Sequence, residues 1–145
     1  MRGAAVLGDS IRPDVVINLE ASIAGDFPQE RSPRRSRIAL GRGPSLFVYD
    51  GSMIPNNNLV ELILALARDS GIPLQLESLA AYAHDGSRLQ TSRHGVAAVN
   101  LGLPVRYAHT ASGVIDRGDY DALVQLLRAI VGAFDATVIE RIQMF

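Results

Sequence analysis

The stretch that decides the fold is residues 15–20, a short apolar run that ends on a carboxylate: Val15-Val16-Ile17-Asn18-Leu19-Glu20. A nearly continuous apolar run of this length predicts a strand buried on both faces, since a half-buried strand would alternate apolar and polar residues. Glu20 directly follows the predicted strand 15–19, at the end where open α/β sheets gather their ligands. Its carboxylate fits either a metal ligand or an ordinary surface charge at a strand terminus.

Outward from this strand, β-rich runs alternate with helical stretches, which indicates an α/β fold with a layered mixed sheet flanked by helices. Further strands are predicted at 45–49, 74–79 and 96–101, and helices at 58–69, 87–92 and 120–134. The clearest helix, 58–69, carries leucine and isoleucine at helical spacing on one face: Leu59, Leu62, Ile63 and Leu66.

Polar and small residues are expected to end these elements. Asparagines at 56–58 offer N-caps for the first long helix, and Gly71 ends it. Asp119 is the expected cap of the last long helix. Gly-Leu-Pro at 102–104 is expected to end the strand 96–101. The tail 137–142 fits either a strand or a helical turn.

Composition and charge limit the classes of function. Apolar residues make up 48% and charged residues 20% of 145 residues, which suits one folded domain. The formal net charge of -1 gives the whole chain no attraction to nucleic acid or to an anionic membrane. A polar loop is predicted from Gly25 to Arg37 and holds the basic cluster Arg31, Arg34, Arg35 and Arg37. This cluster fits a solvated loop or a phosphate patch, although no aromatic residues interleave for base stacking.

The sequence contains no cysteine, which excludes disulfides, thiolate catalysis and zinc–thiolate sites. No apolar run approaches the roughly 20 residues that span a bilayer. The apolar stretch within residues 1–6 is too short for a signal peptide. We therefore expect a soluble, cytoplasmic protein with no membrane partner.

Two further segments combine polar residues with turn residues: 83–87, Ala-His-Asp-Gly-Ser, and 106–110, Arg-Tyr-Ala-His-Thr. In the first, Asp85 fits a helix N-cap with Gly86 easing the turn, or a functional carboxylate. In the second, His109 fits a surface histidine or a ligand. The chain lacks a Gly-rich phosphate loop and a Gly-x-Ser-x-Gly elbow, which argues against nucleotide binding and serine hydrolysis.

Taken in order, these segments resemble the C-terminal half of one family of two-metal aminopeptidases. The family includes glutamyl aminopeptidases, TET aminopeptidases and proteins called cellulase M or endoglucanase M. Residues 15–28 resemble its strand that ends in an acidic ligand, followed by Ala-Gly-Asp-Thr-Pro. Residues 40–44, Leu-Gly-Arg-Gly-Pro, are similar to its Leu-Gly-Lys-Gly-Pro, and residues 83–87 lie where it has Gly-Gly-Thr-Asp-Ala. Residues 103–110 resemble its Ile-Pro-Thr-Arg-Tyr-Ile-His-Ser, whose histidine is a metal ligand.

The resemblance implies a zinc-peptidase-like catalytic domain that removes N-terminal residues from peptides. It implies two divalent metal ions (zinc, cobalt or manganese), with Glu20 a terminal ligand of one and His109 of the other. It places Asp85 and Gly86 near the substrate. Asp116 and the helix after it match the ending of the family.

The chain also departs from the family pattern. Its opening, Met1 to Ala4, aligns with the Leu-Arg-Gly-Ala that follows the Gln-Glu-Glu-Val-Gly of the family, so we expect residues 1–145 to lack the catalytic glutamate. The bridging aspartate, the upstream histidine and the dimerisation insert are expected to be missing too. Gly113 replaces a glutamate that follows the ligand histidine. The resemblance therefore predicts no catalytic residue in this chain, weak metal binding by the chain alone, and a homo-oligomer or a complementing N-terminal chain.

Two other functions stay open. The same missing residues fit a non-catalytic relative that acts as a binding or assembly module. A glycosidase follows only from the cellulase label and needs paired carboxylates across a sugar cleft. Glu20, Glu77 and Asp85 could supply such a pair, but the chain has no Trp to stack on sugar rings.

Overall fold

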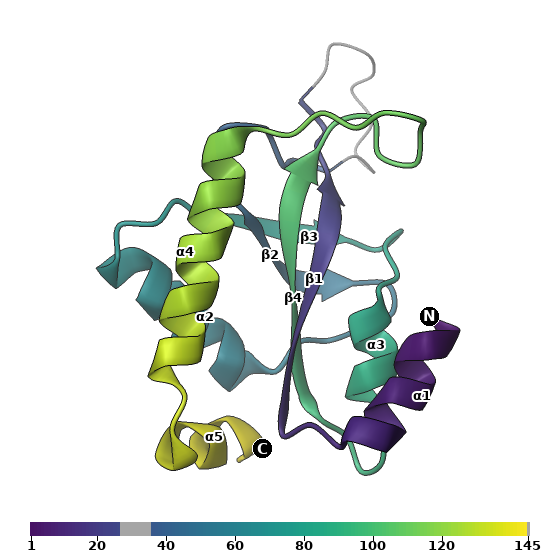
Figure 1. Cartoon of the computed structure of the whole chain (residues 1–145), viewed down its shortest axis with the longest axis vertical. Helices are drawn as coiled ribbons and strands as arrows, with labels where there is room; N and C mark the ends of the chain where they lie inside the picture. Colours follow the sequence, from purple (N-terminus) through teal and green to yellow (C-terminus); the bar gives the residue numbers. More distant parts are fainter. Residues whose placement is uncertain (27–35, 145) are drawn as a thin grey trace.

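The computed structural model describes residues 1–26 and 36–144, and the elements follow one another as shown in Figure 1. The four strands are β1 (Val15–Ile23), β2 (Ser45–Asp50), β3 (Gln75–Leu79) and β4 (Ala97–Val105). The five helices of these described residues are α1 (Arg2–Ile11), α2 (Asn57–Asp69), α3 (Asp85–Gln90), α4 (Arg117–Ala133) and α5 (Ala136–Gln143).

The strands form one mixed sheet in the order β1-β4-β2-β3, which confirms the predicted α/β class. β1 runs parallel to β4 in an unbroken register from Val15↔Ala97 to Ile23↔Val105. β2 is parallel to β3, and it meets β4 antiparallel through two residue pairs. The sheet is therefore two parallel pairs joined along a short antiparallel seam.

Helices cover the two faces of this sheet unequally (Figure 1). α2, α4 and α5 lie on one face, over the main core, whose fully buried members include Leu59, Ile63, Leu126 and Ile130. α1 and α3 pack against each other on the other face, above a smaller cluster that contains Val16, Met53 and Ala98. Successive side chains of β1 point to opposite faces, so Val15 and Ile17 pack against the main core and Val16 belongs to the smaller cluster.

Strand β1 differs from its prediction in length and in burial. It continues through Glu20 to Ile23, because its ladder with β4 runs four positions past the apolar run. Glu20 thus lies inside the strand and pairs with Gly102. The strand is also an edge strand within the described sheet, and the Leu19 side chain is 50% exposed. The prediction that this strand is buried on both faces was therefore wrong.

Strand β4 is also longer than predicted, since it continues through 102–104 to Val105. Gly102 fits there because a Cβ atom would come within 2.5 Å of Ser45 Oγ and 2.6 Å of Ser22 Cβ. Pro104 fits because it lies beyond the last pair that β4 forms with β2, where the sheet needs fewer amide donors.

Asp119 is not the cap of α4. Asp116 caps the helix, accepting from the Gly118 N–H at 2.7 Å and from the Asp119 N–H at 3.3 Å. The Asp119 side chain is buried instead, and it accepts from the N–H groups of Gly41 at 2.8 Å and Gly43 at 2.7 Å. It therefore anchors the 41–44 turn to the start of the helix.

The helix caps of α2 match their prediction: Asn56 accepts from the Leu59 N–H at 2.9 Å, and Gly71 has φ of +64°. The tail left open between strand and helix forms α5. Helix α1 was not predicted. The loop expected at Gly25 to Arg37 lies largely outside the described residues, as do Arg31, Arg34 and Arg35, whereas Arg37 is exposed.

Within the described residues, no single helix is long and apolar enough to cross a membrane. Helices α4 and α5 reach that length and composition only as a pair, across a bend of 99°.

We expect Asp119→Ala to lower the free energy of unfolding by about 2–3 kcal/mol, because it leaves the amides of Gly41 and Gly43 without their charged acceptor. Urea denaturation measures this change. The matched control is Asp121→Ala, which removes only an exposed ion pair with Arg117 and should change stability by less than about 0.5 kcal/mol. Equal losses in the two variants would contradict the anchoring role.

Candidate functional site

The described fold brings Glu20 and His109 to the same hollow, which has a volume of about 350 Å³. Glu20 reaches it from β1, and His109 from the loop that follows β4. The segment between β3 and α3 closes a third side with Tyr82, Ala83 and His84. A larger hollow of about 440 Å³ near the start of α2 is lined by no carboxylate or imidazole. Another hollow, of about 320 Å³, is lined by Asp14 and His94 but by none of the candidate site residues.

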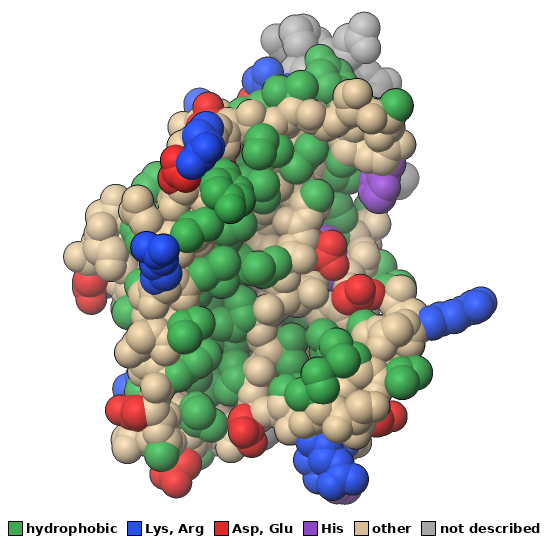
Figure 2. All heavy atoms as spheres, in the orientation of Figure 1, with side chains coloured by type: hydrophobic (Ala, Val, Ile, Leu, Met, Phe, Trp, Pro, Cys, Tyr) green, Lys and Arg blue, Asp and Glu red, His purple; other side chains and the backbone are tan. Residues whose placement is uncertain are grey.

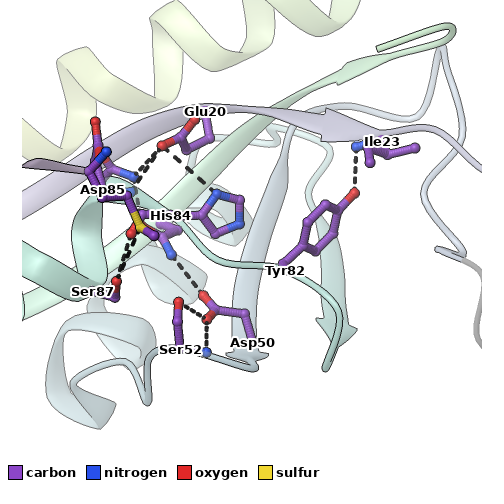
Figure 3. A network of polar contacts seen from close by, with 11 residues as sticks. Glu20, Ile23, Asp50, Ser52, Tyr82, His84, Asp85 and Ser87 are labelled. Carbon is purple, nitrogen blue, oxygen red and sulfur yellow. Dashed lines mark hydrogen bonds and ion pairs between the residues drawn. The ribbon is translucent and has the colours of Figure 1, made fainter. Parts of the chain in front are cut away.

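Glu20 is held through one of its two carboxylate oxygens (Figure 3). Oε1 accepts from the Asn18 side-chain amide at 3.2 Å and from the Asp85 backbone N–H at 3.4 Å. The Nδ1 atom of His84 lies 3.8 Å from the same oxygen. Among residues 1–26 and 36–144, no hydrogen bond is formed with Oε2, so this oxygen is the one available to a ligand.

His84 is a site residue that sequence reasoning missed. Its side chain is only 5% exposed, and its ring packs edge-on against Phe47 with centroids 4.6 Å apart. The Tyr82 ring lies 5.2 Å away on another side. Its Nε2 atom is buried and has no hydrogen-bond partner in the described part of the chain. The apolar neighbours come from segments far apart in sequence, so no local pattern could reveal them.

Tyr82 ties this wall of the hollow to β1. Its hydroxyl accepts a hydrogen bond from the Ile23 backbone N–H at 2.7 Å (Figure 3). This bond gives a partner to a backbone amide near the end of the edge strand. Burial of the phenol raises its pKa to about 12, and the negative charge of Glu77 adds to the shift. The hydroxyl is therefore neutral at physiological pH and acts as a structural link.

His109 sits in a tight loop whose backbone is unusual. Both His109 and Tyr107 have positive φ, at +63° and +61°, a conformation that costs energy for residues other than glycine. The loop is closed at its base by paired hydrogen bonds between Arg106 and Val114, at 2.9 and 3.0 Å. The Thr110 hydroxyl donates to the Tyr107 carbonyl at 2.7 Å. These contacts hold an exposed imidazole at the rim of the hollow.

An ion pair fixes the same loop to the segment after β1. Arg106 donates to both carboxylate oxygens of Asp26, from Nε at 2.8 Å and from Nη2 at 2.6 Å. Asp26 also accepts from the Leu40 N–H at 3.1 Å. The hydrogen bond from Arg106 is the main cause that lowers the pKa of Asp26 below its ordinary value.

Asp85 and Gly86 occupy the start of α3. The residue at the N-cap position is His84, so the alternative of an Asp85 N-cap is wrong, and Asp85 lies in the first turn. Its backbone amide contacts Glu20, and its carboxylate does not line the hollow. Gly86 is buried, and a Cβ atom there would come within 2.3 Å of Asn100 Oδ1. A role of these two residues in substrate binding stays a prediction.

Within the described ranges, no three His, Asp or Glu side chains are close enough to hold one metal ion. Glu20 and His109 would each need further ligands from outside these residues to complete a metal centre.

Two of the solved structures that share this fold are named aminopeptidases. A TET aminopeptidase from a marine-sediment Thaumarchaeota archaeon superposes with a TM-score of 0.93 at 32% identity, over 98% of this chain and 39% of that one. An aminopeptidase from Desulfurococcus kamchatkensis gives 0.91 at 27% identity, over 98% of this chain and 40% of that one. A Thermotoga maritima structure named endoglucanase gives 0.70 at 24% identity, which shows the fold alone.

Residues 1–126 match the M42 glutamyl aminopeptidase family, and the chain belongs to that family. FrvX of Escherichia coli (strain K12), assigned as an aminopeptidase, is 35% identical over 145 residues, which is 100% of this chain and 40% of FrvX. The lysyl aminopeptidase of Pyrococcus furiosus is 31% identical over 132 residues, 90% of this chain and 36% of that enzyme. The chain thus spans about 40% or less of these relatives.

The Asp26–Arg106 pair should make stability depend on pH. The lowered pKa of Asp26 means that the pair stabilises the fold above the ordinary value of 3.8 and that this contribution is lost as pH falls through the lower folded pKa. We expect Arg106→Gln to reduce the free energy of unfolding modestly at pH 7, and the difference from wild type to vanish in acid. Denaturation series between pH 7 and pH 2 measure it. In an Asp26→Asn background the same substitution should show no pH-dependent cost, and a persistent one would exclude this explanation.

Proposed function

We propose that this chain forms the C-terminal part of the catalytic centre of a two-metal aminopeptidase that removes N-terminal residues from peptides. The observation that carries the proposal is the meeting of Glu20 and His109 at one hollow of a family fold. In the proposed centre, Glu20 is a terminal ligand of one metal ion and His109 a terminal ligand of the other. Membership of the M42 family and the likeness to solved aminopeptidases support this role.

The donor set fits divalent metals. Glu20 has an oxygen that no described residue engages, and His109 offers an exposed imidazole at the same rim. Nitrogen and carboxylate oxygen together suit zinc or cobalt, and the carboxylate also suits manganese. No thiolate ligand can come from residues 1–145, because they contain no cysteine.

The division of chemical tasks follows from these residues. When bound, two such metals would supply a polarised carbonyl and an acidified water. Glu20 would hold its metal against β1, because Oε1 is already fixed by Asn18 and by the Asp85 amide. His109 would present its imidazole from a loop pinned by Arg106. We place the general base, the bridging carboxylate and the remaining ligands in the part of the family protein that this chain does not span.

The partners that we propose are peptide substrates and other protein chains. β1 is an edge strand of the described sheet, and its Leu19 side chain is 50% exposed. Figure 2 shows apolar side chains gathered on the face that α4 and the sheet present to the viewer. An unpaired edge beside an apolar face favours a complementing N-terminal segment or a second copy over a free monomer. A cytoplasmic location stays a prediction.

A non-catalytic binding module is the second candidate function. The observation that favours it is that no group of three metal-binding side chains gathers within the described residues. The DNA upstream of Met1 distinguishes the two candidates. An in-frame run that encodes Gln-Glu-Glu-Val-Gly supports the enzyme, and a stop codon followed by a ribosome-binding site supports the module.

We expect residues 1–145 alone to show no peptidase activity, because a metal held by a single protein ligand binds weakly and because we place the base that activates its water outside these residues. The assay uses chromogenic aminoacyl substrates with added cobalt or zinc. Clear turnover that His109→Ala abolishes would contradict this expectation.

In the complete gene product, we expect His109→Ala to weaken cobalt binding by more than about 100-fold, since the loss of a direct ligand exceeds the loss of a supporting contact. Isothermal titration with Co²⁺ measures the affinity. His94→Ala is the matched control, because His94 does not line the hollow and its removal should leave the affinity unchanged. Equal affinity in both variants would remove His109 from the metal centre.

A further inference from the structure

A chain of side-chain amides connects Glu20 to the far end of β2 (Figure 3). The Asn18 amide nitrogen donates to Glu20 Oε1 at 3.2 Å and to Asn100 Oδ1 at 2.9 Å. The Asn100 amide nitrogen in turn donates to Asp50 Oδ2 at 3.0 Å. Asn100 is 0% and Asp50 2% exposed, so water is excluded from the centre of the chain.

The direction of this chain is set by the Asp50 end. Its Oδ1 accepts the Ser52 backbone N–H at 2.7 Å and the Ser52 hydroxyl at 2.8 Å, and a backbone N–H can only donate. Both oxygens of Asp50 are acceptors, so the group that faces Oδ2 must be the NH₂ of Asn100. The Asn100 oxygen then faces Asn18, and Asn18 must turn its NH₂ toward both Asn100 and Glu20. The orientation of two amides follows from one acidic side chain.

We infer that Asp50, Asn100 and Asn18 are positioning residues that hold Glu20 Oε1 and leave Oε2 as the oxygen that meets a ligand. The inference rests on the proposed function in that the ligand is taken to be a metal ion. None of the three residues has a catalytic role. Asn18 contacts Glu20 directly, and Asn100 and Asp50 act on Glu20 through Asn18. A supporting partner of a metal ligand ordinarily changes metal affinity by about 10- to 100-fold.

Gly86 belongs to the same arrangement. A Cβ atom at this position would come within 2.3 Å of Asn100 Oδ1 and 3.2 Å of Asn18 Cβ. Any side chain here would displace the two amides from each other. The glycine of the 83–87 segment thus provides the space in which the amide chain forms.

A reciprocal exchange of side chains tests the direction of the chain. In Asp50→Asn, the new amide keeps its oxygen on the Ser52 N–H and turns its NH₂ toward Asn100. Asn100 must then rotate so that its oxygen accepts from position 50 and its NH₂ faces Asn18. Asn18 must rotate in turn to accept from Asn100. The Asn18 oxygen then faces Glu20 Oε1, and these two acceptors repel each other. In the double variant Asp50→Asn/Asn100→Asp, the NH₂ at position 50 donates to a carboxylate at position 100, which again accepts from Asn18.

The first readout needs no metal. In residues 1–145, hydrogen exchange of the Asn18 side-chain NH₂ measured by NMR should be at least about tenfold slower than that of exposed Asn57. The protection should be lost in Asp50→Asn and regained in the double variant. The matched control, Asp69→Asn, makes the same change at an exposed site and should leave it intact. Unchanged protection in folded Asp50→Asn, or a double variant no better than the single one, would overturn the inference.

The second readout is Co²⁺ affinity of the complete gene product. It should fall about tenfold or more in Asp50→Asn and recover in the double variant. If Asp50→Asn fails to fold, Asn18→Leu removes the donor to Glu20 and to Asn100 at a partly exposed position, and it should weaken affinity by a similar factor while the chain stays folded. Unchanged affinity in folded Asn18→Leu would overturn the inference. If protection follows the exchange but Glu20→Gln binds Co²⁺ as wild type does, the amide chain stands and the metal role of Glu20 fails.

Discussion

The parallel ladder between β1 and β4 is the constraint on which the rest of the site depends. Parallel strands that pair in register end at the same edge of a sheet, and here the pairing runs unbroken from Val15↔Ala97 to Ile23↔Val105. Glu20 near the end of one strand and His109 just beyond the other therefore reach one hollow, although they are 89 positions apart in the sequence, 109 less 20. The ladder also places Asn18 beside Asn100, which is the central step of the amide chain.

Features with a local cause could be predicted from the sequence. The segment 57–69 contains an apolar stripe at helical spacing, an asparagine cap before it and a glycine after it. The structure has all three features at the helix α2. The strand runs were found because apolar stretches of that length have few other structures available. The resemblance of the polar segments, taken in order, to one family was confirmed by the family match over residues 1–126.

Features with a distant cause could not be predicted. Asp119 precedes a helical stripe and so fits a cap, but its partners are amides of Gly41 and Gly43, far away in sequence. The burial of His84 depends on Phe47 and Tyr82, and the edge position of β1 depends on which strands are available to pair with it. Helix α1 was missed because its main packing partner is α3, which is far away in the sequence. Gly8 lies against Ser92, just after α3, where a Cβ atom would come within 2.8 Å of the Ser92 side chain.

The turn at Gly43 has a consequence for how the protein can vary. A Cβ atom at this glycine would lie 2.2 Å from the backbone oxygen of Pro73, and the glycine already has φ of +88°. No side-chain rearrangement relieves a collision with a main-chain atom, so relief would require the turn before β3 to move. Because Asp119 also binds the Gly43 amide, such a movement would reach the first turn of α4. The three segments are therefore coupled, and a side chain at position 43 should be tolerated only together with compensating changes in the turn before β3 and at the start of α4.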